Sequence, residues 1–188
     1  MAATFLKAKS YEVGLSLIEA DRLDTTAWLM EKAVRNGVRL LLPVDVVVAD
    51  DTGTKAKGKV LSIESISPRQ RIVDIGPRTV KQFQEELQKC QTVFWNGPMG
   101  IYEIPQFAKG TRAMAKLLAG LEATTIIGGG STAEKVTKMG LADKMSFVST
   151  GGGASLRFLG GQALPGVEAL HDKDSLATGI LRELTPTR

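Results

Sequence analysis

The residues that build disulfides, zinc sites and histidine triads are almost missing from this 188-residue chain. Cys90 is the only cysteine and His171 the only histidine. One cysteine excludes an internal disulfide and a cysteine metal cluster, and a single histidine argues against a His-based triad or zinc site. We therefore expect no resident metal, and a reducing, cytoplasmic environment fits best.

Long apolar runs and clusters of like charge are lacking too. No apolar run approaches the roughly 20 residues that cross a membrane, and the N-terminus lacks the basic-then-apolar layout of a signal peptide. The net charge is +4, but the basic residues are spread out and form no stripe. We therefore expect neither a membrane nor a nucleic acid as a partner.

Apolar residues and glycine are well represented. The chain is 43% hydrophobic and 23% charged, which is ordinary for a soluble globular protein, and its length suits one sizeable domain. The twenty glycines cluster at the ends of apolar runs rather than in a low-complexity tract. Their placement predicts turns between strands and helices.

Short apolar segments alternate with amphipathic patterns in the second half of the chain. We expect strands at 92–95, 124–127 and 145–148, and helices at 111–121, 133–139 and 154–159. This alternation predicts an α/β fold with a doubly wound parallel sheet, a Rossmann-like three-layer αβα arrangement. In such sheets the turns that follow the strands share one edge, where ligands bind.

The first half is less regular. Asp24 could cap a helix at 25–36, and Gly76-Pro77 opens another helix. Between them, Pro43 interrupts an apolar run at 38–49, and short strands are expected at 60–63 and 71–75. Asp45 lies within the apolar run and is either a buried, hydrogen-bonded structural group or a site residue; we favour the first. Both Trp28 and Trp95 are expected in the core.

Two glycine-rich turns are the most informative motifs. Ile126-Ile127-Gly128-Gly129-Gly130-Ser131-Thr132 and Val148-Ser149-Thr150-Gly151-Gly152-Gly153-Ala154-Ser155 each join an apolar run to a helical pattern. Unpaired backbone N–H groups at such a turn can bind phosphate, and the hydroxyls of Ser131 and Thr132 could assist. Alternatively, each is a tight turn with a hydroxyl helix cap. Two adjacent turns favour a nucleotide site.

These turns fit neither of the common phosphate-binding fingerprints. No lysine follows either glycine triplet at the Walker spacing, and the Gly-x-Gly-x-x-Gly pattern of dinucleotide sites is absent. Cationic assistance for a bound phosphate must therefore come from elsewhere in the fold.

A third turn occupies the corresponding place one unit earlier, Trp95-Asn96-Gly97-Pro98-Met99-Gly100. Beyond it, Glu103 could accept both hydroxyls of a ribose, while Pro98 and Ile101 offer an apolar surface to a base. Alternatively, Glu103 is a solvated loop residue.

These motifs together resemble the phosphoglycerate kinase family, specifically its C-terminal, nucleotide-binding half. The matching stretches follow the family's order and spacing from Met1 to Leu170; they are residues 4–8, 42–50, 74–77, 95–100, 127–130, 149–155 and 164–170. By this resemblance, residues 1–170 are a partial nucleotide-binding domain and residues 171–188 a C-terminal tail.

The resemblance implies reversible phosphoryl transfer between ATP and 3-phosphoglycerate in glycolysis or carbon fixation, with Mg²⁺ arriving as MgATP or MgADP. It implies that Glu103 binds the ribose and that Asn96, Pro98 and Ile101 line the nucleotide site. Ser131 and Thr132 complete the first turn. The resemblance implies that the amides of the two triplets face the transferring phosphoryl group; these are Gly128, Gly129, Gly130, Gly151, Gly152 and Gly153. Among them, Gly129 and Gly152 are expected to be the catalytic residues.

The chain departs from the family in what precedes Met1. In the family, Met1-Ala2 follows a Gly-Gly-Gly turn inside the nucleotide domain. The resemblance therefore implies that the N-terminal domain that binds 3-phosphoglycerate, a lysine-bearing segment and two strands of the sheet are absent. We expect the 188 residues alone to be inactive. The alternatives are a non-catalytic nucleotide-binding module and a self-associating module, although the family is usually monomeric.

A second departure generates a test. Ser131 stands where the family usually has an aspartate that assists the metal–nucleotide complex, and a hydroxyl is a weaker Mg²⁺ ligand than a carboxylate. We predict weakened binding of the metal–nucleotide complex, so Ser131→Asp should increase the Mg²⁺ dependence of ADP affinity in a calorimetric titration. An unchanged Mg²⁺ dependence would contradict this.

Overall fold

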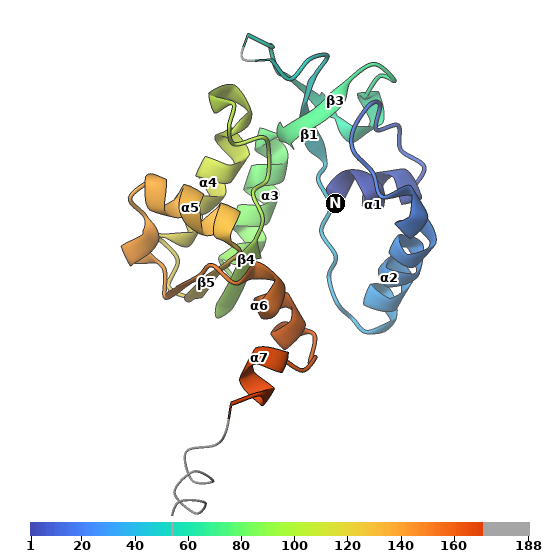
Figure 1. Cartoon of the computed structure of the whole chain (residues 1–188). Coiled ribbons are helices and arrows are strands. Elements are labelled where there is room, and N and C mark those ends of the chain that lie inside the picture. The colour runs from blue at the N-terminus through green and yellow to red at the C-terminus, as the bar shows by residue number, and fades with distance from the viewer. Residues whose placement is uncertain (54, 171–188) are drawn as a thin grey trace, which may run out of the picture.

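Two three-stranded sheets organise the chain in the computed structural model, which describes residues 1–53 and 55–170 (Figure 1). One sheet is antiparallel, in the order β2-β1-β3, and the other is parallel, in the order β4-β5-β6. Their strands are β1 (Asp45–Ala49), β2 (Lys59–Ser62), β3 (Arg71–Ile75), β4 (Thr92–Asn96), β5 (Thr124–Gly128) and β6 (Phe147–Ser149). The predicted tail, residues 171–188, lies outside the described residues.

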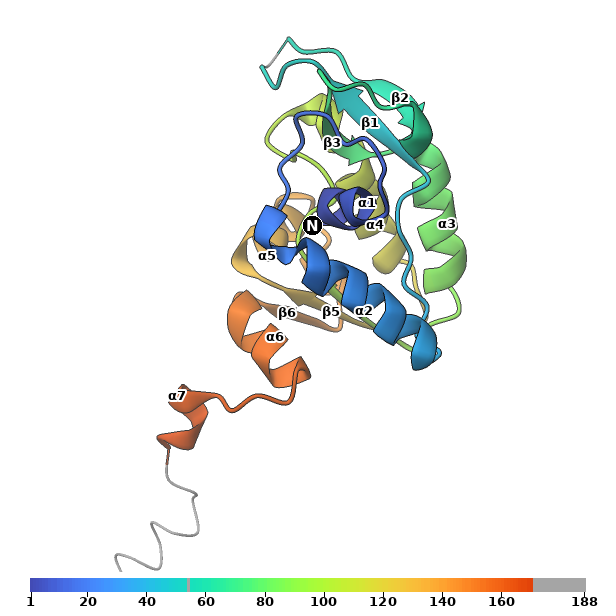
Figure 2. The ribbon, with the colours of Figure 1, turned by 90° about the vertical axis from the view of Figure 1, so that its right-hand side faces the viewer.

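The described residues form seven α-helices, of which α3, α4 and α5 each connect two successive strands. They are α1 (Ala2–Ala8), α2 (Leu23–Arg35), α3 (Pro77–Leu87), α4 (Lys109–Leu118), α5 (Gly130–Lys138), α6 (Gly152–Leu159) and α7 (Pro165–Glu168). Figure 2 shows the antiparallel sheet at one end of the molecule, with α6 and α7 extending from the other end. No helix of residues 1–53 and 55–170 is both long and apolar enough to cross a membrane.

The parallel sheet holds the largest core and confirms the predicted α/β class. Val93, Trp95 and Ile127 point toward α3, α4 and α5, where they pack with Met114, Leu118 and Val136. Because strand side chains alternate between faces, Phe94 and Ile126 point the other way. There they line a groove with Phe158 and Leu159 of α6. Helices therefore lie on both faces of the sheet.

The antiparallel sheet is a feature that the strand–helix alternation did not specify. β1 pairs with β2 and with β3, and the second pairing contains a register shift between Val47 and Val48. Strand β1 begins at Asp45, two residues after Pro43. This start is expected because proline has no backbone N–H to donate to a neighbouring strand. A separate cluster of Ala3, Leu6 and Val13 packs α1 near this sheet.

Asp45 is a buried structural group, as predicted. Its side-chain oxygens accept hydrogen bonds from the backbone N–H of Arg78 (3.0 Å) and of Thr79 (2.7 Å), both in the first turn of α3. The Thr79 hydroxyl, also fully buried, accepts from the backbone N–H of Val44 at 3.0 Å. An anion at a helix N-terminus is favourable, and here it joins β1 to α3.

Asp74, near the end of β3, joins this strand to the N-terminus of α4. Its carboxylate accepts from the backbone N–H of Gly110 and of Ile75, each at 2.8 Å. Burial raises the pKa of Asp74, and these backbone hydrogen bonds oppose the rise. The two aspartates together position α3 and α4 against the sheets.

Two predictions about the first half are wrong. α2 begins at Leu23, directly after a short 3₁₀ turn, so Asp24 lies inside the helix and caps nothing. Trp28 is 50% exposed, with Lys32 Nζ 4.7 Å from its ring centroid, whereas Trp95 is buried as predicted. Gly37 follows the helix with a φ of +64°, a backbone conformation that glycine adopts readily at a helix C-terminus.

The role of Asp45 gives the first test on the structure. Asp45→Ala removes the acceptor of the Arg78 and Thr79 amides and of the buried Thr79 hydroxyl, so the free energy of unfolding should fall by about 2–3 kcal/mol in urea denaturation. Asp50→Ala, one residue beyond β1 and exposed, is the matched control and should change it by less than about 0.5 kcal/mol. Equal effects of the two variants would contradict the role assigned to Asp45.

Candidate functional site

The three predicted turns share one edge of the parallel sheet. In the strand register Asn96 is level with Gly128, and Gly128 is level with Ser149. Each of these is the last residue of its strand. The turns that follow β4, β5 and β6 therefore emerge side by side, at the edge where parallel sheets bind ligands.

The two glycine turns touch through their backbones. A Cβ atom placed on Gly152 would lie 2.8 Å from Gly129 Cα, and one placed on Gly129 would lie 2.9 Å from Asn96 Oδ1. Gly129 also has a φ of +95°, which side-chain-bearing residues rarely adopt. Only glycine at both positions permits this approach, which brings the N-termini of α5 and α6 together beside Asn96.

The structure changes which amides are available to a ligand. Gly129 N–H donates to Ser149 O at 3.0 Å, Gly152 N–H to Thr150 O at 3.1 Å, and Gly151 N–H to Ser149 Oγ at 3.2 Å. Gly128 is buried as part of β5. The Gly129 amide therefore links the two turns and the Gly152 amide closes its own turn in this conformation, and a direct catalytic role for these two amides remains a prediction.

The free donors are the amides of the first helical turns. Within residues 1–53 and 55–170, the backbone N–H groups of Gly130, Ser131, Thr132, Gly153 and Ala154 have no acceptor. This is the ordinary state of a helix N-terminus, and an anion is the ligand that suits it. Because α5 starts three residues earlier than predicted, the free amides of this helix lie one to three residues beyond Gly129.

The two hydroxyls of the first turn have different environments. Thr132 is buried, and its Oγ1 accepts a hydrogen bond from Gly97 N–H at 2.9 Å, so it links the turn after β4 to α5. Ser131 is exposed, and its Oγ lies 3.2 Å from Lys135 Nζ. Neither caps the helix, because the N-cap residue is Gly129.

Glu103 reaches this edge through Lys135. Glu103 Oε1 lies 3.1 Å from Lys135 Nζ, and the lysine side chain is 8% exposed while the glutamate side chain is 70% exposed. A hydrogen bond from its own backbone N–H lowers the pKa of Glu103, and the bond from Lys135 lowers it further. The ion pair is therefore complete at neutral pH and is lost only as the pH falls through that lowered pKa.

The other two predicted lining residues, Pro98 and Ile101, have different environments. Pro98 is exposed in the turn after β4. Ile101 donates its backbone N–H to Val73 O at 2.9 Å and packs against the cluster that contains Ile104 and Phe107. The structure thus joins Asn96, both glycine turns and Glu103, and places Ile101 in a neighbouring core.

Sequence reasoning missed Lys135. Its position four residues after Ser131 puts both on one helix face, and side chains on a helix lean toward its N-terminus. This spacing could have suggested that the ammonium returns to the glycine turn. The sequence did contain a sign that Lys135 is buried, because it lies beside the apolar residues Ala133 and Val136 of the same helix.

The described residues at this edge form no protein-only cage for a divalent metal. Mg²⁺ prefers carboxylate and carbonyl oxygens, and in the described part of the chain no three acidic, histidine or cysteine side chains are grouped to hold a metal. Ser131 supplies a hydroxyl, and Glu103 is paired with the Lys135 ammonium. The free backbone amides and the Lys135 ammonium are groups that suit an anion.

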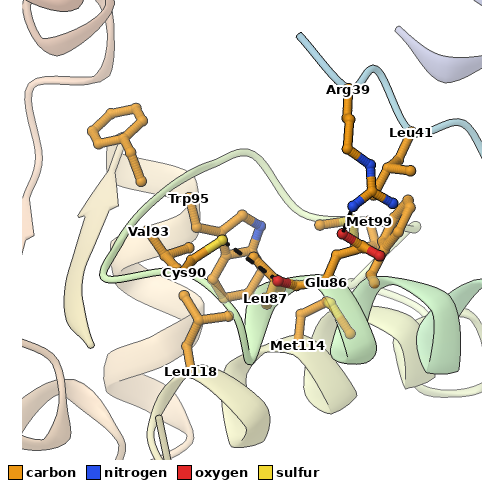
Figure 3. A pocket seen from close by; sticks show the side chains of 12 residues that line it. Arg39, Leu41, Glu86, Leu87, Cys90, Val93, Trp95, Met99, Met114 and Leu118 are labelled. Atoms are coloured by element: carbon orange, nitrogen blue, oxygen red, sulfur yellow. Dashed lines mark hydrogen bonds and ion pairs between the residues drawn. The ribbon is translucent and has the colours of Figure 1, made fainter. Parts of the chain in front are cut away.

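A separate apolar cavity of about 390 Å³ opens beside β4 (Figure 3). Val93 and Trp95 of β4, Leu87 of α3 and Met114 of α4 line it, and the Arg39–Glu86 ion pair lies at one side. Trp95 Nε1 is buried without an acceptor among the described residues. The cavity has none of the phosphate-binding groups described above.

The same ordered features occur in known proteins. The family model described as phosphoglycerate kinase matches residues 1–162. The chain belongs to the phosphoglycerate kinase family. Phosphoglycerate kinase of Thermosynechococcus vestitus is 54% identical over 175 residues, which is 92% of this chain and 44% of the relative. Phosphoglycerate kinase of Clostridium tetani is 49% identical over 173 residues, or 92% of this chain and 43% of the relative.

Solved phosphoglycerate kinase structures share the fold. The Coxiella burnetii structure matches with a TM-score of 0.82 and 44% identity, covering 86% of this chain and 42% of that one. The Pyrococcus horikoshii structure matches with a TM-score of 0.75 and 30% identity, covering 90% and 42%. The chain thus spans less than half the length of these phosphoglycerate kinases.

The contact between the glycine turns predicts a contrast between adjacent glycines. Gly152→Ala forces a methyl group against the Gly129 backbone, so the free energy of unfolding should fall by about 1–3 kcal/mol. A Cβ at Gly153 meets nothing within 4 Å. Gly153→Ala should therefore leave stability unchanged or raise it by up to about 1 kcal/mol, as measured by urea denaturation. Two equally stable variants would contradict the close approach.

Proposed function

We propose that this chain forms the nucleotide-binding part of a phosphoglycerate kinase, which transfers a phosphoryl group reversibly between ATP and 3-phosphoglycerate. In this reaction 1,3-bisphosphoglycerate and ADP give 3-phosphoglycerate and ATP. The observation that carries the proposal is the convergence of two helix N-termini beside Asn96, with free amides at Gly130, Ser131 and Gly153. Membership of the family supports it.

The proposed roles follow from the chemistry of phosphoryl transfer. Such enzymes act almost entirely by positioning the reactants and by stabilising charge on the transferred group. Fixed N–H donors do this without reorganisation, because the fold has already oriented them. The amides of the α5 and α6 N-termini would hold the phosphate chain, with Gly129 and Gly152 fixing their separation.

Glu103 is proposed to recognise the ribose. Its carboxylate is exposed and pairs with the same Lys135 ammonium that contacts Ser131 after the glycine turn, so a nucleotide whose phosphates rest on the free amides could place its sugar hydroxyls against Glu103. Pro98 offers an exposed apolar surface next to Asn96 for the base. Ile101, from its neighbouring core, would support that surface rather than contact the base.

The 3-phosphoglycerate half of the reaction is assigned to residues beyond this chain, which spans 44% of its Thermosynechococcus vestitus relative. We propose that residues 1–170 form a nucleotide-binding unit in the cytoplasm and that the 188 residues alone do not turn over. The resemblance implies MgATP and MgADP as the nucleotides. In residues 1–53 and 55–170 no three acidic, histidine or cysteine side chains are grouped to hold a metal, so a Mg²⁺ ion would arrive with the nucleotide as part of the substrate.

The ribose contact gives a test of the site. The 188-residue chain should bind ADP more tightly than 2′,3′-dideoxy-ADP by about tenfold, as calorimetric titration in the presence of Mg²⁺ would measure, because two hydroxyls donate to a charged acceptor. Glu103→Gln should reduce this ratio toward one. The ratio isolates the sugar contact from any change in phosphate binding.

Glu134→Gln is the matched control. Glu134 is another exposed glutamate paired to a lysine, Lys138, on α5, and its substitution should leave the ratio unchanged. Equal affinities for the two nucleotides in the unsubstituted chain would contradict the role of Glu103. Absence of any ADP binding would contradict the proposed function itself.

A further inference from the structure

Lys135 is a buried cation beside the free amides of α5. Only 8% of its side chain is exposed. Its Nζ lies 3.2 Å from Ser131 Oγ, 3.1 Å from Glu103 Oε1 and 5.2 Å from the centroid of the Tyr102 ring. The ammonium is therefore held on several sides at the entrance to the first glycine turn.

This is an unusual place for a positive charge. The N-terminus of a helix already carries a partial positive charge from the aligned peptide dipoles. Adding a lysine ammonium there is unfavourable unless an anion compensates for it. Among the described residues, Glu103 is the carboxylate that pairs with Lys135. It comes from a loop rather than from α5, and 70% of its side chain is exposed. One exposed, displaceable carboxylate thus balances a fixed cation and three free amides.

The surroundings favour an anion over a metal complex. Ser131 contributes no charge, and the residues here supply no group of carboxylates for a dication. The Lys135 ammonium would repel a dication close to Ser131, whereas it attracts a phosphate in a largely buried position, where screening by solvent is weak.

We propose that Lys135 binds the phosphate chain of the nucleotide and supplies the charge that a divalent metal would otherwise supply. The nucleotide then binds as the metal-free anion. Its phosphate replaces Glu103 on Lys135, and the released carboxylate becomes available to the ribose hydroxyls. This inference deepens the proposed function and rests on it.

The test compares ADP affinity with and without metal. The 188-residue chain is titrated calorimetrically with ADP in excess Mg²⁺ and again in EDTA. We expect the dissociation constant in EDTA to exceed that in Mg²⁺ by less than tenfold. Lys135→Met should weaken binding in EDTA by tenfold or more, because it removes a charge-assisted hydrogen bond to phosphate.

Two further variants serve as controls. Lys138→Met removes the next lysine of α5, which is exposed and paired with Glu134, and should change the affinity by less than about twofold. Lys135→Arg keeps the charge and should retain most of the metal-free affinity. Circular dichroism establishes that each variant is folded, and a misfolded Lys135→Met is replaced by the comparison of Lys135→Arg with Lys135→Gln.

The outcomes separate this inference from the proposed function. A loss of tenfold or more on removing Mg²⁺ from the unsubstituted chain, or unchanged metal-free binding in Lys135→Met, would overturn the inference while the nucleotide site stands. Absence of binding under both conditions would overturn the proposed function and the inference with it.

Inorganic pyrophosphate provides a second readout that involves no ribose. Glu103→Gln removes the competing carboxylate, so metal-free pyrophosphate should bind this variant at least threefold more tightly than the unsubstituted chain. Lys135→Met should bind it more weakly. Weaker pyrophosphate binding by Glu103→Gln would contradict the exchange of anions at Lys135.

Discussion

The close approach of Gly129 to Gly152 is the constraint on which the site depends. Their backbones lie so near that a single methyl group on Gly152 would come within 2.8 Å of Gly129 Cα. This contact sets the spacing of the α5 and α6 N-termini and uses the amides of both glycines in internal hydrogen bonds. The donors left free are those of the next residues along each helix, which can act together on one anion.

The rest of the fold stabilises that edge through buried polar contacts. Thr132 joins the turn after β4 to α5, while Asp45 and Asp74 join β1 and β3 to the N-termini of α3 and α4. In each case a short polar side chain accepts from otherwise unpaired backbone amides, which is costly to disrupt in a buried position. In the part of the chain that the structure describes, the N-termini of α5 and α6 have no such side-chain acceptor, so their first amides are available to a ligand.

Much of this could be predicted from local patterns. The parallel strands, the Gly76-Pro77 helix start and the structural role of Asp45 follow from apolar periodicity and from residue types with one dominant use. The antiparallel pairing of β1 could not, because strand direction depends on contacts distant in sequence. Within the two triplets Gly129, Gly151 and Gly152 donate inside the turns while the amides of Gly130 and Gly153 are free, a division that a local motif cannot reveal. Lys135 was missed because its burial depends on Glu103 and Tyr102.

The proposed nucleotide site places the phosphates on the N-termini of α5 and α6. This placement can be tested by a ¹⁵N-edited NMR titration of the 188-residue chain with ADP. The largest amide shifts are expected at Gly130, Ser131, Thr132 and Gly153. Largest shifts around the cavity beside β4, at Leu87 and Met114, or no shifts at the glycine turns, would contradict it.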